Sequence, residues 1–276
     1  MTIKDVLNIG VKKRLECENP TNRGNLECEI LLCNILNKDR IFLHTNSNLA
    51  LQDSTIETFF SQIERLKNNY PLEYITKKVS FYSMEFFIDE GALIPRPETE
   101  ILIDKVLDLI KKHNITQIYE IGIGSGIISI ILALHCKNLK ITATDISKQS
   151  LKIARKNLKL KSKLDSTLEK RIKLVQTNLL DNIAFDKNAL IVSNPPYINN
   201  SYKIPLNLAF EPQIALFGGE IGDEIIRQII DLDSTFLCCE IGYNQCYLKK
   251  YLSHYKFVEF YKDYSNLTRG FVASKV

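Results

Sequence analysis

From about residue 115 onward, short apolar runs alternate with helical patterns, and few folds accommodate such a chain. The runs are rich in β-branched residues and are bounded by glycine, proline or polar residues, so each is interpreted as a buried strand. Strands that alternate with helices are typical of an α/β fold with a mostly parallel sheet covered on both faces. The expected strands are residues 118–121, 139–145, 172–175, 190–193 and 236–241, with a closing hairpin from 257–260 and 269–273.

The part before this alternation shows two other patterns. Apolar residues recur at helical spacing over residues 1–72, with Asn25 as a candidate cap for a second helix and Asp53 or Ser54 for a later one. Between residues 74 and 95 the period changes to two, which predicts a hairpin of strands 79–82 and 84–88. We therefore expect a helical domain, a hairpin linker and an α/β domain.

Composition and charge narrow the class of protein. Lys and Arg exceed Asp and Glu by only four over the 276 residues, and the two kinds balance over residues 1–70. This balance argues against stable nucleic-acid binding and favours a helical domain that docks a protein, although a purely structural cap fits nearly as well. Residues 137–173 carry twelve Lys or Arg against three Asp or Glu, a pattern that favours a solvated helix face over an RNA-binding patch.

Cysteine, histidine and terminal patterns exclude other classes. The seven cysteines contain no C-x-x-C pair and the four histidines show no metal-ligand spacing, so neither a metal site nor a disulfide framework is expected. The start of the chain has no apolar signal region, and the long apolar stretch 118–134 contains Glu120 and three glycines. We expect a cytoplasmic, monomeric protein without a membrane segment.

A rigid tetrapeptide follows the expected strand 190–193. Asn194 precedes Pro195 and Pro196, which fix φ and forbid continuation of the strand, and Tyr197 comes next. The Asn194 amide oxygen and the Pro195 carbonyl can then face the same way beside the aromatic ring. Two fixed acceptors and a flat ring suit a planar –NH2 group, so the tetrapeptide is a candidate acceptor site for such a group.

A second motif lies between the strand at 118–121 and the following helix. Glu120 is followed by glycines at 122, 124 and 126, which let the backbone approach a ligand and allow positive φ. The spacing differs from the dinucleotide pattern and lacks the lysine of a phosphate-binding loop. Asp145 ends the next strand, where an acid can bind both ribose hydroxyls. A cofactor with a ribose but no phosphate is S-adenosylmethionine.

Further stretches accompany these motifs. They are Leu-Ile-Pro-Arg-Pro-Glu-Thr-Glu at 93–100, Glu-Pro and Ala-Leu-Phe-Gly-Gly within 211–219, Glu-Ile-Gly and Gln within 240–245, and Lys-Asp and Arg within 262–269. With the glycine turn, Asp145 and the tetrapeptide, they make the chain resemble the release factor glutamine methyltransferases over essentially its whole length. The resemblance implies a helical substrate-recognition domain (1–72), a hairpin linker (73–95) and a Rossmann-like class I methyltransferase domain (96–276) with a mixed seven-stranded sheet.

The resemblance also implies the reaction and its residues. The family transfers a methyl group from S-adenosylmethionine, leaving S-adenosylhomocysteine, to the side-chain amide nitrogen of the glutamine in the Gly-Gly-Gln motif of class I peptide-chain release factors. The implied catalytic and substrate-binding residues are Asn194, Pro195, Pro196 and Tyr197, and the implied cofactor-binding residues are Gly122, Ile123, Gly124, Ser125, Gly126, Asp145, Leu179 and Asn194. Methylation of the N6 amine of adenine in DNA or RNA is the alternative, because the same tetrapeptide serves such enzymes.

The chain departs from the family pattern at four positions. Lys77 and Ser83 stand where the hairpin often has glycines, and Ile221 replaces an acid after the second Gly-Gly. Asn178 replaces an acid before Leu179, the residue expected against the adenine, so its hydrogen bond to the base is weaker than that of a carboxylate. None of these changes removes the expected reacting groups.

Overall fold

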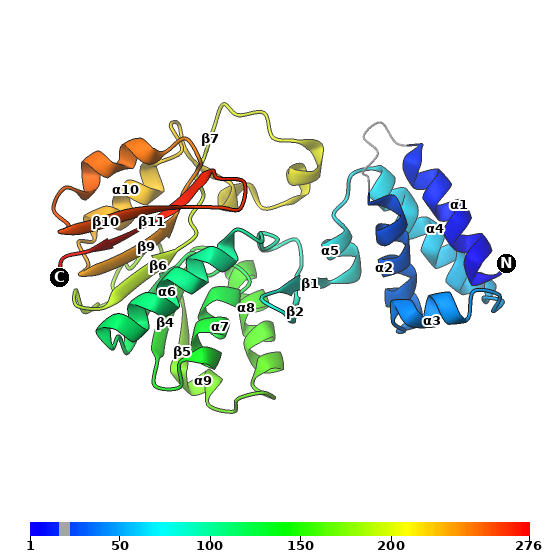
Figure 1. Cartoon of the computed structure of the whole chain (residues 1–276), viewed down its shortest axis with the longest axis horizontal. Coiled ribbons are helices and arrows are strands. Elements are labelled where there is room, and N and C mark those ends of the chain that lie inside the picture. Colours follow the sequence, from blue (N-terminus) through cyan, green and yellow to red (C-terminus); the bar gives the residue numbers. More distant parts are fainter. Residues whose placement is uncertain (17–22) are drawn as a thin grey trace. The chain divides into compact units, whose positions relative to one another are not determined.

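The structure is a computed structural model that describes residues 1–16 and 23–276. The chain forms two compact units (Figure 1). The N-terminal unit contains residues 1–77 together with the segment 205–210, and the C-terminal unit contains residues 78–204 and 211–276. Within the described residues, no helix is long and apolar enough to cross a membrane.

The N-terminal unit is helical. Its first helix starts with a capping box, in which the Thr2 hydroxyl accepts from the Asp5 N–H and the Asp5 carboxylate accepts from the Thr2 N–H. A Cβ on Gly10 would lie 2.6 Å from the Phe59 ring, so a glycine lets the first and fourth helices approach closely. The helices are α1 (Ile3–Leu15), α2 (Gly24–Leu36), α3 (Arg40–Thr45), α4 (Asp53–Lys67) and α5 (Leu72–Thr76).

Two expected helix caps are wrong. Helix α2 starts two residues earlier than expected, so Asn25 lies inside its first turn and Arg23 is the N-cap. Asp53 is the first residue of α4 and Gln52 is its N-cap. An acid in the first turn is still favourable because it faces the positive end of the helix dipole. The short helices α3 and α5 were not predicted, since five or six residues are too few to show helical periodicity.

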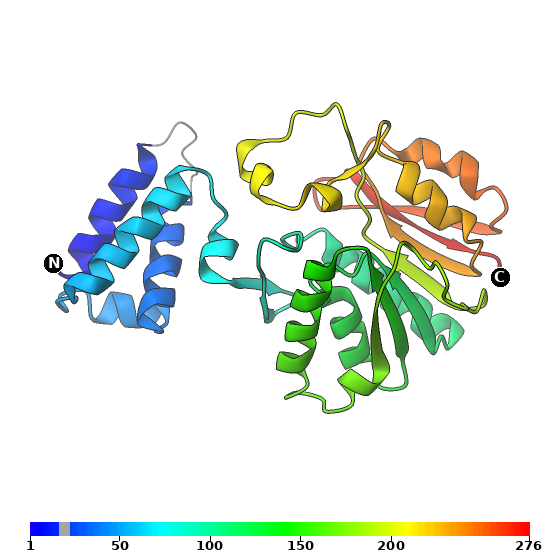
Figure 2. The same ribbon diagram turned by 180° about the vertical axis from the view of Figure 1, so that it is seen from behind.

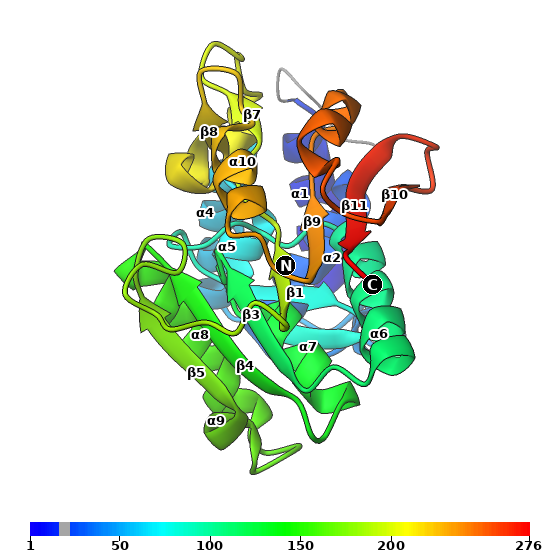
Figure 3. The ribbon, with the colours of Figure 1, turned by 90° about the vertical axis from the view of Figure 1, so that its left-hand side faces the viewer.

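The C-terminal unit is built on a mixed seven-stranded sheet (Figures 1 and 3). Its strand order is β10-β11-β9-β6-β3-β4-β5, and all pairs are parallel except those made by β11. The strands are β3 (Gln117–Ile121), β4 (Lys140–Asp145), β5 (Ile172–Gln176), β6 (Leu190–Ser193), β9 (Phe236–Glu240), β10 (Phe257–Lys262) and β11 (Thr268–Ser274). The expected α/β class and all seven of these strands are confirmed.

Alternation along the strands divides the side chains between two helical layers. Tyr119 of β3 and Cys239 of β9 pack in one core cluster with helix α10 (Glu224–Asp231). Their neighbours Glu120 and Glu240 point to the opposite face and bond to residues of the helices there. Those helices are α6 (Thr99–His113), α7 (Ile127–His135) and α8 (Lys148–Lys161), which are seen from behind in Figure 2.

The expected hairpin is present as β1 (Lys78–Phe81) and β2 (Met84–Phe87). Lys77, Tyr82 and Ser83 have φ of +59°, +50° and +58°, a region that favours glycine. Two of these residues, Lys77 and Ser83, stand where the family resemblance leads us to expect glycine, and their positive φ is strained for residues with a Cβ. The Asn157 side chain of α8 bonds both the N–H and the carbonyl of Phe87 and so ties the hairpin to the helical layer.

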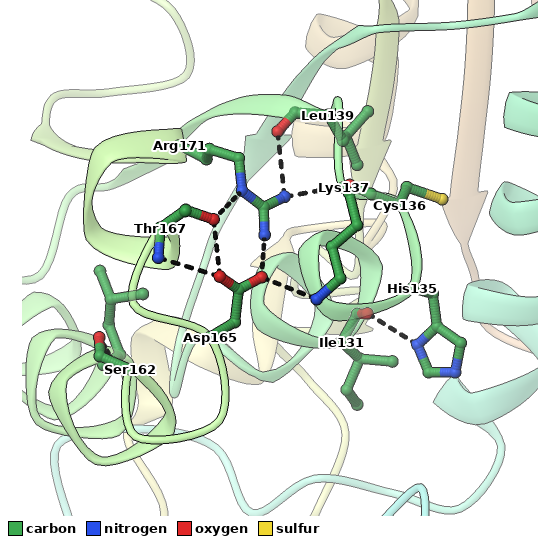
Figure 4. Close-up of polar contacts among 10 residues, drawn as sticks. Ile131, His135, Cys136, Lys137, Leu139, Ser162, Asp165, Thr167 and Arg171 are labelled. Carbon is green, nitrogen blue, oxygen red and sulfur yellow. Dashed lines mark hydrogen bonds and ion pairs between the residues drawn. The ribbon is translucent and has the colours of Figure 1, made fainter.

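Some basic residues of the stretch 137–173 form ion pairs within the protein. Asp165 accepts from Arg171 at 2.8 Å and from Lys137 at 2.9 Å, and Thr167 bonds its other oxygen (Figure 4). Hydrogen bonds from Thr167 and Lys137 hold the pKa of the Asp165 carboxyl well below its usual range. The Arg171 guanidinium also donates to the Cys136 carbonyl, which closes the loop before β4. This network includes α9 (Leu168–Arg171), a helix too short to predict.

Candidate active site

A cavity of about 310 Å³ lies at the carboxyl ends of β3, β4 and β6. This edge of a parallel sheet is where open α/β folds bind ligands. Nine of the predicted site residues line one cavity, whereas Gly126 and Tyr197 do not: the nine are Gly122, Ile123, Gly124, Ser125, Asp145, Leu179, Asn194, Pro195 and Pro196. Ile146, Ser150 and Ile214 also line the cavity and were not among the predicted site residues. Leu93 and Thr99 line it too, and both belong to the stretch 93–100 that accompanies the motifs.

The glycine turn combines open space with unusual backbone. Gly122, Gly124 and Gly126 have φ of +75°, +53° and +85°, which residues with a Cβ rarely adopt. A Cβ on Gly122 or Gly124 would meet no atom within 4 Å, so the backbone there borders free volume. At Gly126 a Cβ would lie 3.1 Å from that of Ala154, so this third glycine serves packing against α8.

Asp145 is held by the backbone on both oxygens. One oxygen accepts from the Gly124 N–H at 2.9 Å and the other from the Ser147 N–H at 2.8 Å. Burial raises the pKa of this carboxyl, and the two backbone hydrogen bonds oppose the rise. Each carboxylate oxygen keeps a further lone pair, so the group can still accept from a pair of hydroxyls.

The Asn194 side chain belongs to a chain of hydrogen bonds. Its Nδ2 lies 3.2 Å from Thr99 Oγ1, and Thr99 Oγ1 donates to Glu240 Oε2 at 2.8 Å. The Tyr197 hydroxyl lies 3.4 Å from Glu240 Oε1, and the Tyr197 ring packs against the core cluster of β3, β6 and β9. Burial raises the pKa of Glu240 to about 7, against the opposing effect of the Thr99 and Tyr197 hydrogen bonds.

The backbone of the tetrapeptide has its own supports. Gln245 donates from Nε2 to the Tyr197 and Gly222 carbonyls at 3.2 and 3.0 Å. A Cβ on Gly218 would lie 2.3 Å from the Pro196 carbonyl oxygen, so glycine is required for this approach. These contacts come from the short strands β7 (Ile198–Asn199) and β8 (Phe217–Gly219) and the turn after β9.

The segment before α6 is tied to a distant carboxylate. Glu211 accepts from the Ile94 N–H at 2.9 Å and forms an ion pair with Arg96. Arg96 also donates to the Ile94 carbonyl at 2.7 Å. Only 4% of Glu211 is exposed, so the pair fixes the loop that carries Leu93 to the cavity. Over residues 1–16 and 23–276, no cluster of His, Cys, Asp or Glu side chains could hold a metal ion.

Known proteins match this chain in both sequence and fold. Residues 98–209 match the Methyltransferase small domain, and residues 11–76 match the PrmC N-terminal domain. A release factor glutamine methyltransferase of Dictyoglomus turgidum is 41% identical over 234 residues, which cover 83% of this chain and 80% of that protein. One of Buchnera aphidicola is 31% identical, with coverage of 95% and 96%. The human METTL16 catalytic domain, solved with MAT2A 3′UTR hairpin 1, has a TM-score of 0.57 at 16% identity, with coverage of 91% for each chain.

The sheet order, the ligand edge and the domain match define an S-adenosylmethionine-dependent methyltransferase of class I. The likeness to METTL16 supports the fold alone. The identity to release factor glutamine methyltransferases is above 30% over most of both chains. The protein therefore belongs to this family.

Proposed function

We propose that this enzyme transfers a methyl group from S-adenosylmethionine to the side-chain amide nitrogen of the glutamine in the Gly-Gly-Gln motif of class I release factors. The observation that carries this proposal is that Asn194 and Pro195 share one cavity with the glycine turn and Asp145. The candidate amide acceptors and the candidate ribose-binding acid thus border the same cavity, and relatives of this chain are named for this reaction.

The cofactor would lie along the carboxyl edge of β3 and β4. Residues 122–126 supply the close backbone approach, and the Asp145 carboxylate would accept from the ribose hydroxyls. Leu179 would cover the adenine, and the Asn178 side chain would accept from the adenine amino group. Both residues line the cavity. Departure of the methyl group would leave S-adenosylhomocysteine in the same place.

The substrate amide would be held rather than deprotonated. An amide nitrogen is a poor nucleophile because its lone pair is delocalised. Asn194 Oδ1 and the Pro195 carbonyl would accept the two amide hydrogens and turn the nitrogen toward the sulfonium methyl, while the Tyr197 ring would pack on the amide plane. Catalysis of this kind is positioning and transition-state hydrogen bonding, and the proton leaves after in-line transfer.

The N-terminal unit would recognise the release factor. The helices of residues 1–72 carry balanced charge, which suits a protein better than nucleic acid. We further propose that the enzyme acts as a monomer in the cytoplasm, without stable binding to nucleic acid.

Substitutions in the tetrapeptide test this assignment with labelled S-adenosylmethionine and a purified release factor. Asn194→Ala removes one acceptor and should slow transfer by on the order of 100-fold. Asn194→Asp keeps an acceptor and should retain part of the rate. Tyr197→Phe should be mild and Tyr197→Ala severe, since the ring provides the packing. Full activity of folded Asn194→Ala would remove that residue from the reaction.

A further inference from the structure

We infer that Glu240 and Thr99 are positioning residues for methyl transfer, because together they determine which way the Asn194 amide faces. This inference rests on the proposed function, in which Asn194 must present its oxygen to the substrate. Glu240 ends β9, Thr99 starts α6 and Asn194 follows β6, so three separate elements meet at this point. Both Glu240 and Thr99 are 2% exposed.

The donors and acceptors in this chain of contacts fix the amide orientation. A carboxylate only accepts hydrogen bonds, and a hydroxyl has a single proton to give. The Thr99 hydroxyl donates its proton to Glu240 Oε2 at 2.8 Å. Toward Asn194, Thr99 Oγ1 can therefore only accept. Asn194 must therefore turn its NH2 group to Thr99, and its Oδ1 is left for the other side. Without this bias the amide could rotate by half a turn and present donors to a substrate that itself offers N–H groups.

The same carboxyl also holds the last residue of the tetrapeptide. Glu240 Oε1 lies 3.4 Å from the Tyr197 hydroxyl, while Oε2 holds Thr99. Because burial raises the pKa of Tyr197, its hydroxyl keeps its proton and remains a donor. One buried carboxylate thus anchors Asn194 through a hydroxyl and Tyr197 directly, although it lies outside the cavity wall.

The orientation depends on the charge of Glu240. A proton on Oε2 would donate to Thr99, and the released Thr99 hydrogen could then favour the opposite face of the Asn194 amide. The surroundings of this carboxyl include two charged side chains: Arg269 of β11 favours ionisation, and Glu98 before α6 opposes it. Tyr261 of β10 also faces this group, whereas Cys239, the residue before Glu240 in β9, points to the other face of the sheet. Since the pKa of Glu240 is about 7, kcat should rise with pH through neutrality.

The test compares variants of the full-length enzyme with a release factor as substrate. Thr99→Val keeps the shape but removes the hydroxyl, and kcat should fall roughly 10- to 100-fold, as when a transition-state hydrogen bond is lost. Thr99→Ser should recover most of that loss. Glu240→Gln should show low kcat with no rise between pH 6 and 8. Glu259→Gln, a matched change at an exposed position of β10, the edge strand of the same sheet, should keep the wild-type profile.

Two further measurements separate positioning from general damage. Calorimetry should give cofactor affinities for all variants within about threefold of wild type. A change in the orientation of the Asn194 amide should lower kcat without weakening cofactor binding. In nitrogen-15 spectra, one Asn194 side-chain proton should exchange slowly in wild type and Thr99→Ser and faster in Thr99→Val. Wild-type kcat and unchanged exchange in Thr99→Val would overturn the inference. A wild-type enzyme that leaves release factors unmethylated would overturn the proposed function instead, and the exchange rates would still decide the orientation.

Discussion

Replacement of Gly218 by alanine probes how closely the tetrapeptide backbone must be placed. The new Cβ would lie 2.3 Å from the Pro196 carbonyl oxygen and 2.7 Å from that of Gly222. Both neighbours are backbone atoms, so they cannot rotate away as a side chain could. Restoring an ordinary contact of about 3.4 Å requires a shift of about 1 Å. A 1 Å misplacement of reacting groups costs on the order of 100-fold in rate, or about 2.7 kcal/mol in the activation barrier.

The assay for this variant is kcat with a release factor, together with cofactor affinity by calorimetry and a thermal melt. We expect a large loss in kcat with cofactor affinity within a few-fold of wild type, because the glycine turn and Asp145 lie on other strands. Gly24→Ala is the matched control, since its Cβ would meet no atom closer than 3.6 Å. A folded Gly218→Ala enzyme with more than half of the wild-type kcat would show that catalysis does not need this close approach to the tetrapeptide backbone.

Three other outcomes are expected. Asp145→Ala should weaken cofactor binding in calorimetry by roughly 1–3 kcal/mol, the scale of lost charged hydrogen bonds, and an unchanged affinity would remove Asp145 from the ribose. A chain that begins at Glu73 should bind cofactor but methylate a whole release factor poorly in a labelling assay, and an intact rate would reduce the helical domain to a cap. Burial raises the Glu120 pKa from 4.5 to about 8, so the folded state binds more protons between these values and stability falls as pH rises, by at most about 1.4 kcal/mol per pH unit. Glu120→Gln should therefore flatten the dependence of thermal stability on pH from 5 to 8, and an unchanged slope would place the titration elsewhere.

The fold was predictable because its elements carry local signals. Short apolar runs and the alternating pattern near the C-terminus predicted all seven strands of the sheet, and the glycine turn marked the junction of β3 and α7. Helix α8 begins after Ser147, whose side chain accepts from the Ser150 N–H at 3.2 Å, a local capping signal. Elements without such signals were missed, among them α9, β7 and β8. Each is four residues or shorter, and periodicity does not register at that length.

Only the site residues that lie in a local sequence motif were predictable. Asn194 was identified because it follows one expected strand, and Asp145 because it ends another. Both line the same cavity in the structure. Glu240, Thr99 and Gly218 act through partners far away in the sequence. Their contacts depend on sheet order and on which face a strand residue occupies. Sequence similarity marked these positions as family features, but the pairing between them needed the three-dimensional arrangement.

The enzyme is proposed to transfer the methyl group to the side-chain amide of a release-factor glutamine. Mass spectrometry of the peptide that carries Gly-Gly-Gln, after incubation with enzyme and S-adenosylmethionine, locates the product directly. We expect one added methyl group on the glutamine side chain, formed more slowly by on the order of 100-fold with Asn194→Ala. An unmodified peptide, with methylated adenine in RNA or DNA present in the same reaction, would contradict the proposed function.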